Sequence, residues 1–152
     1  MKLLIDTNII IDALTGREPF REAAEQIFLL AANRTEDMYI TAGSATDIYY
    51  IVRKYLHSTK QAKNTMSKLY ELFCILDVTA DDCQEALLTD MKDYEDSVVC
   101  CCAKRNRMEY IITRNIKDYK NSKVQAMLPD EFIKMVTSYE WWCNHCIWHN
   151  ST

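Results

Sequence analysis

The sequence predicts an α/β fold of three layers, in which helices cover both faces of a mainly parallel sheet of roughly five strands. Short apolar runs of strand length alternate along the chain with longer segments whose apolar residues recur at helical spacing. Only two glycines and two prolines occur in 152 residues, and the chain has no low-complexity stretch, internal repeat or linker. These features favour one compact domain rather than several.

The elements of the first half follow from these patterns. Residues 2–5 form an apolar run that ends at Asp6, as expected of a buried strand. Asp12 lies on the helix after this strand and is expected to be solvated. The other elements of this half are a helix, a strand and two helices, at 18–32, 38–41, 45–56 and 61–73.

The second half continues the alternation. After a third strand, Thr79, Asp81 and Asp82 are residues that start helices, and Asp93 can cap the helix after that. Pro129, followed by two acids, opens the last helix. The expected elements are a strand at 74–78, a helix at 83–91, a helix through 98–103, strands at 110–113 and 124–127, and a helix through 132 to about 139.

The charges are unevenly distributed, although the net charge is only −4. Between Ile48 and Tyr70 there are five cations and no acid, whereas residues 77–96 carry eight acids and one lysine. A second basic cluster consists of Lys104, Arg105, Arg107, Arg114, Lys117, Lys120 and Lys123. A basic stripe beside an acidic pocket suits an enzyme that grips phosphates while holding divalent cations, and ordinary solvated helix faces would give the same pattern.

The cysteines predict a reducing compartment. Three of the seven are consecutive, at residues 100–102 within an apolar run, which makes a poor disulfide framework. Cys74, Cys83 and the triplet are therefore expected to be small buried hydrophobic residues. The chain has no signal peptide and no apolar run of roughly 18 residues, so we expect a cytoplasmic protein without a membrane span.

Four acids fall at or near predicted strand ends, where open parallel sheets form their binding crevice. They are Asp6, Asp47, Asp96 and Asp118. Their hard oxygen ligands suit Mg²⁺ or Mn²⁺, and a cation would relieve the mutual repulsion that raises the pKa of grouped carboxylates. The scarcity of glycine excludes a Walker loop, and the three histidines do not support a Ser/His/Asp or Cys/His nucleophile.

Four segments together support a named resemblance. LLIDTNIIIDAL, ITAGSATDIYYIVRK, DYEDSVVCCCAKRNRMEYIITRNIKDY and LPDEF resemble the motifs of the PIN-domain family, in the branch that includes VapC-type toxins. The resemblance covers roughly residues 1–136. It implies a PIN-like fold for residues 1–139 and leaves residues 140–152 as a C-terminal tail.

The resemblance also implies roles for individual residues. Asp6 matches the first metal-binding acid, with Asn8 as the polar neighbour that positions it, and Asp96 matches the third acid. Asp47 matches the second acid, where much of the family has glutamate; its shorter side chain suggests a role through water, and capping of its helix is the alternative. Glu95 is expected to point to another face of its helix than Asp96, and both Asp93 and Glu95 are expected to lie outside the set of ligands.

The fourth acid departs from the commoner pattern. Asn115 stands where many relatives have an acid, and Asp118 follows three residues later, so either Asp118 fills the role or the site has three carboxylates. Thr113 is expected to form a hydrogen bond within the site, or only to cap the following turn. The resemblance thus predicts Asp6, Asp96 and Asp118 as metal ligands.

The activity implied by the resemblance is Mg²⁺-dependent or Mn²⁺-dependent hydrolysis of RNA by inline attack of an activated water, as in a toxin of a toxin–antitoxin pair. A homodimer and an antitoxin partner are implied as well. Arg53, Lys54 and Arg114 are expected to contact RNA. The alternatives are a degenerate PIN domain that binds RNA or protein without cutting, and a phosphotransfer receiver domain, which the lack of paired acids after the first strand weakens.

The tail is rich in tryptophan, cysteine and histidine. Cys143 and Cys146 have the CxxC spacing of zinc ligands, with His145 and His149 nearby. The alternatives are a helix end packed by tryptophans or a contact between subunits. The tryptophans concerned are Trp141 and Trp142.

Overall fold

A computed structural model of the protein describes the backbone of residues 1–146 and the side chains of residues 1–138. Its sheet has five strands, all parallel, in the order β3-β2-β1-β4-β5. The strands are β1 (Lys2–Ile5), β2 (Asp37–Thr41), β3 (Cys74–Leu76), β4 (Tyr110–Ile112) and β5 (Gln125–Met127). The predicted α/β class and strand number are confirmed, and the sheet is entirely rather than mainly parallel.

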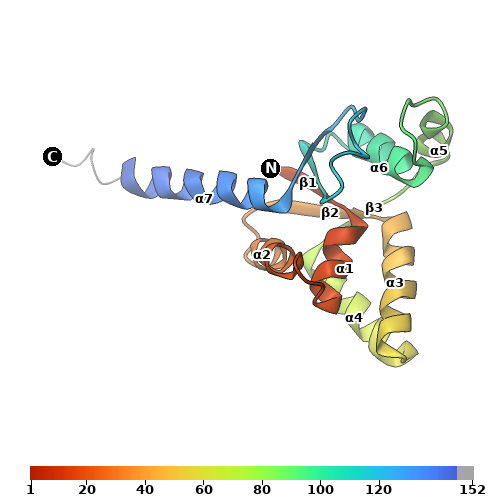
Figure 1. The fold of residues 1–152 in the computed structure, drawn as a ribbon, viewed down its shortest axis with the longest axis horizontal. Helices are drawn as coiled ribbons and strands as arrows, with labels where there is room; N and C mark the ends of the chain where they lie inside the picture. The colour runs from red at the N-terminus through yellow and green to blue at the C-terminus, as the bar shows by residue number, and fades with distance from the viewer. Residues whose placement is uncertain (147–152) are drawn as a thin grey trace.

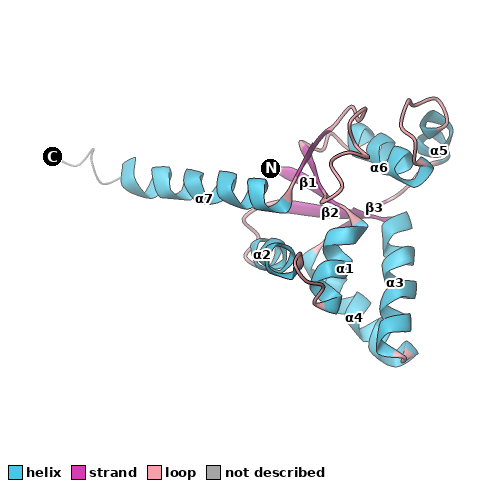
Figure 2. Ribbon diagram, viewed as in Figure 1, coloured by secondary structure: helices cyan, strands magenta, loops and turns pink. Residues whose placement is uncertain are grey.

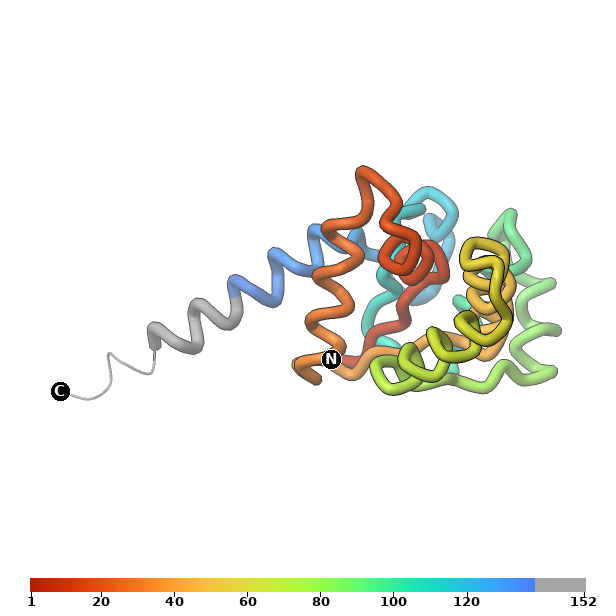
Figure 3. Tube along the Cα trace, turned by 90° about the horizontal axis from the view of Figure 1, so that it is seen from below, coloured from red at the N-terminus to blue at the C-terminus, as the bar shows by residue number. Residues whose placement is uncertain are grey.

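Helices cover both faces of this sheet, which gives three layers (Figures 1 and 2). They are α1 (Thr7–Thr15), α2 (Arg21–Ala32), α3 (Ala42–Leu56), α4 (Thr59–Leu72), α5 (Ala80–Ala86), α6 (Tyr94–Arg105) and α7 (Pro129–Cys146). In the view of Figure 1, α1 to α4 lie below the sheet and α5 and α6 above it. Figure 3 shows the start of α7 beside α2.

The side chains of each strand alternate between two apolar cores, as the two-residue repeat of a strand requires. Leu3 and Ile5 belong to the larger core on the side of α1 to α4, and Phe132 from α7 is buried in the same core. Leu4 and Ile111 face the smaller core under α6. Every central strand is therefore covered twice, which explains its nearly continuous apolar sequence.

Capping residues set several helix boundaries. The hydroxyl oxygen of Thr41 accepts a hydrogen bond from the Ser44 amide at 3.0 Å, so α3 begins at residue 42, earlier than predicted. Asp47 is consequently not the cap of its helix. A capping box of Thr79 and Asp82 starts α5 at residue 80, and α5 ends at Ala86 rather than at residue 91.

Three predictions about burial are wrong. Asp12 is fully buried, whereas we expected a solvated side chain. Cys74 is exposed on the edge strand β3, and Cys83 is only half-buried, while the three consecutive cysteines are buried as predicted. The possible zinc ligands and tryptophans of the tail lie outside the residues whose side chains are described. Within residues 1–146, no helix is long and apolar enough to cross a membrane.

Candidate active site

The carboxyl ends of the strands bring together side chains from distant parts of the sequence. Asp6 directly follows β1, and its amide donates a hydrogen bond to the Ile112 carbonyl of β4 at 3.0 Å. Thr113 directly follows β4, so it lies next to Asp6 although the two residues are 107 positions apart. Helices α1 and α3 leave the sheet at this same edge (Figure 1).

The Asp6 carboxylate is held by two neighbours. The Thr113 hydroxyl donates to Asp6 Oδ2 at 2.6 Å, and Asn8 Nδ2 donates to the same oxygen, also at 2.6 Å. Thr113 in turn accepts a hydrogen bond from the Asn115 amide at 3.0 Å, so it both bonds within the site and caps the following turn. Burial raises the pKa of Asp6 above its ordinary value, although these hydrogen bonds act in the opposite direction.

Asp96 lies in the first turn of α6, where Asp93 caps the helix as predicted by accepting the Asp96 amide at 3.0 Å. The hydroxyl of Tyr119 donates to Asp96 Oδ1 at 3.1 Å. Burial, together with the negative charges of Asp6, Asp93 and Asp118, raises the pKa of Asp96 to about 6, although the Tyr119 hydrogen bond acts in the opposite direction. Asp6 and Asp118 are therefore each close enough to Asp96 to repel its negative charge.

Tyr119 is a site residue that the sequence did not single out. It is buried, and burial followed by the charges of Asp6 and Asp96 raises the pKa of its hydroxyl. The hydroxyl consequently stays protonated and acts as a hydrogen-bond donor. The sequence feature that could have identified it is its position: Tyr119 is an aromatic residue with a polar hydroxyl, directly after Asp118 in the polar segment that follows β4.

Asp47 lies beside Glu95 rather than directly beside Asp6. Partial burial raises the pKa of Glu95, and the charges of Asp47, Asp93 and Asp96 and a hydrogen bond with Asp47 raise it further. We expected Glu95 to point away from the other acids, and that expectation is wrong. Because Asp47 is on α3 and Glu95 on α6, the two helices present an acidic pair next to the group of Asp6, Asp96 and Asp118.

The loop after β4 contributes charge through Asp118. Asn115 and Asp118 are both exposed in this loop. The Asp118 carboxylate contributes to the raised pKa of Asp96, whereas the Asn115 side chain is neutral. Asp118 is thus the residue of this loop that adds a negative charge to the crevice.

This set of donors fits a hard divalent cation that retains water. Among the described residues, no three His, Cys, Asp or Glu side chains are close enough to form one metal site by themselves. Mg²⁺ commonly takes only one or two carboxylates and keeps several waters, so a closed protein cage is not required. Desolvation raises the pKa of Asp6, and desolvation with repulsion raises that of Asp96; a bound cation would offset both effects.

Arg114, which we expected to contact RNA, faces the protein interior. Its Nε lies 2.8 Å from Asp12 Oδ2, and its guanidinium stacks over the ring of Phe20 at 4.5 Å from the ring centre. The Asp12 side chain is 1% exposed and the Arg114 side chain 22%. The two carboxylate oxygens of Asp12 and Nε of Arg114 make no well-aligned hydrogen bond, so the attraction between the two side chains is ionic rather than directional. The pair ties α1 to the loop that follows Thr113.

Comparisons with known proteins agree with this geometry. The PIN domain family matches residues 2–117 of the chain. The fold resembles a toxin–antitoxin complex from Klebsiella pneumoniae, with 23% identity, a TM-score of 0.63 and coverage of 84% of this chain and 97% of that one. DNA-bound VapBC from Salmonella typhimurium has 16% identity and a TM-score of 0.64, with coverage of 85% and 98%.

A third structure with this fold is VapC20 from Mycobacterium tuberculosis, described as a toxin that cleaves the sarcin-ricin loop. It has 12% identity and a TM-score of 0.57, and the match covers 72% of this chain and 86% of that one. No curated protein matches the chain. Because the family match extends over most of the chain and the acids gather at the strand ends, this protein belongs to the PIN domain family.

Proposed function

We propose that the protein is a Mg²⁺-dependent or Mn²⁺-dependent endoribonuclease and the toxin of a toxin–antitoxin system. The observation that carries the proposal is the electrostatic coupling of Asp6, Asp96 and Asp118 at the carboxyl edge of the sheet. These three residues would hold the cation. When bound, the cation stabilises negative charge on the phosphodiester and lowers the pKa of a nearby water.

The surrounding residues position the carboxylates. Thr113 and Asn8 both donate to one oxygen of Asp6 and thus limit its rotation. Tyr119 orients Asp96 by donating a hydrogen bond to one of its oxygens. The first turn of α6 favours the ionised form of Asp96, because the positive end of the helix dipole lies there. In this proposal Asp47 and Glu95 lie at the rim of the site and act on the cation through water.

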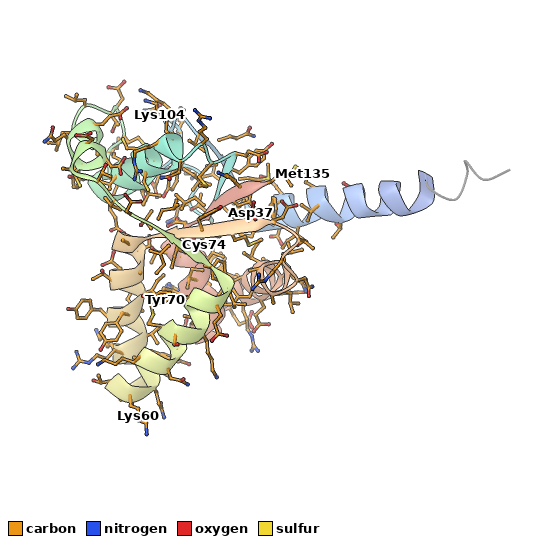
Figure 4. The ribbon with its side chains drawn as sticks, turned by 180° about the vertical axis from the view of Figure 1, so that it is seen from behind. Asp37, Lys60, Tyr70, Cys74, Lys104 and Met135 are labelled. Carbon is orange, nitrogen blue, oxygen red and sulfur yellow. The ribbon has the colours of Figure 1, made fainter. Side chains whose placement is uncertain are left out.

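Cleavage of a mixed cellular RNA pool tests the proposal. The purified protein with Mg²⁺ is expected to yield discrete fragments, and EDTA, Asp6→Asn and Asp96→Asn are each expected to abolish them. Asp37→Asn is the matched control, since Asp37 is an exposed acid at the amino end of β2 (Figure 4). Fragments that persist in EDTA or in both site variants would exclude this site as their source.

A non-catalytic RNA-binding or protein-binding PIN domain is the second candidate. The neutral Asn115 in the loop after β4 favours it, because it adds no negative charge, and so does the aspartate at position 47, because its side chain is shorter than that of a glutamate. Intact RNA in every lane, with Mn²⁺ tested as well, would establish this candidate over the nuclease.

Protein partners are part of the proposal. Leu87 and Leu88 after α5 are 72% and 85% exposed, which supports burial in a homodimer. We expect the wild type to sediment as a dimer and Leu88→Glu as a monomer, and a monomeric wild type would refute the dimer.

An antitoxin is expected to suppress cleavage when it is coexpressed with the protein. The cytoplasmic location remains a prediction.

A further inference from the structure

The two basic clusters of the sequence differ in the structure. In the second cluster, Lys104 Nζ lies 2.8 Å from Glu85 and Lys123 Nζ lies 3.9 Å from the same carboxylate. Arg105 forms an ion pair with the buried Asp82 at 2.8 Å. With Arg114 paired to Asp12, much of this cluster is neutralised by acids of the protein itself. It therefore offers few free cations to a phosphate.

The first cluster has no such compensation. Its five cations are all exposed, on the last turns of α3 and on α4, and none of them forms an ion pair with any described residue. They are Arg53, Lys54, Lys60, Lys63 and Lys68. Figure 4 shows Lys60 at the end of α4 remote from the sheet, whereas Lys104 lies in the opposite layer. Among the described residues, the first cluster therefore consists of unpaired cations, whereas four of the seven cations of the second cluster are paired.

A pocket of about 460 Å³ opens within this charge, at the turn from α3 to α4. It is lined by Tyr50, Arg53, Lys54, His57, Ser58 and Thr59. No acid contributes to the lining, and the polar groups are a guanidinium, an ammonium, an imidazole and hydroxyls that can donate hydrogen bonds. The ring of Tyr50 is 60% exposed at the pocket rim. This combination suits a phosphate flanked by a planar base.

Helix α3 connects this pocket to the acids. Asp47, Tyr50 and Lys54 are spaced three and four residues apart and so lie on one face of the helix. The distance along the helix axis from Asp47 to Lys54, which are seven positions apart, is about 10 Å. A stacked strand rises ~3.4 Å per nucleotide, so about three nucleotides bridge this distance.

We propose that the α3–α4 pocket binds a backbone phosphate of a single-stranded RNA whose neighbouring segment reaches the acidic crevice, with one base stacked on Tyr50. The proposal rests on the proposed function and specifies its substrate. The RNA must carry an unpaired strand of at least about three nucleotides on one side of the crevice, because a duplex would withhold its bases from Tyr50.

Binding of labelled oligouridylates of two and eight nucleotides, measured by fluorescence anisotropy in EDTA across a range of KCl concentrations, tests the pocket without cleavage. The full-length wild type is compared with Arg53→Gln/Lys54→Gln and with Tyr50→Ala. The control, Arg17→Gln/Lys134→Gln, removes two exposed cations from other elements. All substituted side chains are exposed, so circular dichroism should report unchanged folds.

For the octanucleotide, the Arg53→Gln/Lys54→Gln variant should lower the slope of log affinity against log salt by about 1.4, at ~0.7 for each lost contact. Tyr50→Ala should weaken binding on the order of 10-fold. The control variant and the dinucleotide should change little. An unchanged slope, or equal losses in the control variant, would overturn the proposal.

An RNA cleavage assay of the same proteins distinguishes the proposed RNA site in the pocket from the proposed nuclease activity. If the wild type and the Arg53→Gln/Lys54→Gln variant both cleave RNA and have equal salt slopes, the proposed RNA site in the pocket is wrong and the proposed nuclease activity stands. If RNA binding depends on the pocket residues but no cleavage occurs, the proposed RNA site stands and the proposed nuclease activity is wrong. A changed sedimentation coefficient with unchanged RNA affinity would assign this face to a protein interface instead and overturn the RNA site.

Discussion

The buried ion pair of Asp12 and Arg114 allows a quantitative prediction. Arg114→Met keeps an unbranched apolar stem but leaves the Asp12 carboxylate, 1% exposed, without the cation that lies at 2.8 Å. Removal of one partner from a buried pair costs about 3–5 kcal/mol. Because the Arg114 side chain is 22% exposed and partly hydrated, we expect the lower value, ~3 kcal/mol. Loss of the stacking on Phe20 adds about 0.5–1 kcal/mol.

A total loss of ~3.5–4 kcal/mol corresponds to a fall in Tm of about 7–16 °C for a domain of this size. Thermal unfolding followed by circular dichroism at pH 7 measures it. Asp12→Asn/Arg114→Met removes both charges and should be more stable than Arg114→Met, because no uncompensated charge remains buried. Arg17→Met, a change at an exposed arginine, is the matched control. A Tm of Arg114→Met close to that of the wild type, or a double variant no more stable than the single one, would refute the reasoning.

Three further predictions concern other residues. Gly16→Ala should destabilise the protein by ~1 kcal/mol in urea unfolding, because Gly16 ends α1 at a φ of +64°, where a Cβ is unfavourable. The pKa of Asp96 is raised to about 6, so between about pH 4 and pH 6 the folded protein retains a proton that the unfolded chain has lost. The free energy of unfolding should therefore rise as the pH falls from about 6 to about 4, and Asp96→Asn should remove that rise. Burial would raise the pKa of Asp82, but the Arg105 hydrogen bonds outweigh it and lower the pKa, so Asp82 should stabilise the fold above about pH 4 and cease to do so as the pH falls further. Asp82→Asn should remove this stabilisation at neutral pH, and unfolding curves at several pH values would reveal it.

The positions of the strands and of most acids were predictable because they depend on short stretches of sequence. An apolar run that ends in an acid identifies both β1 and Asp6, and the same holds for β4 and the polar segment that contains Asp118. Parallel strands share a carboxyl edge, so acids at their ends were expected to meet. The pKa of Asp96 supports that expectation for Asp6 and Asp118.

Other features could not be predicted because they depend on distances between remote residues. Asp12 occupies a helix position that looks polar, and its burial follows from Arg114, a residue about a hundred positions later that reaches it across the sheet edge. Glu95 was expected to face away from the other acids, but the fold brings the start of α6 close enough to α3 for Glu95 to interact with Asp47. Tyr119 likewise acquires its role from Asp96.

The sequence by itself determined the order of strands and helices, the parallel sheet, and the acids at its carboxyl edge, because periodicity and capping act over a few residues. Only the tertiary structure decided which charges are free. Lys104, Arg105 and Arg114 each meet an acid from another element, whereas Arg53 and Lys54 meet none among the described residues. The Coulomb energy of two charges depends on their separation in space and on local burial, and neither can be read from positions along the chain.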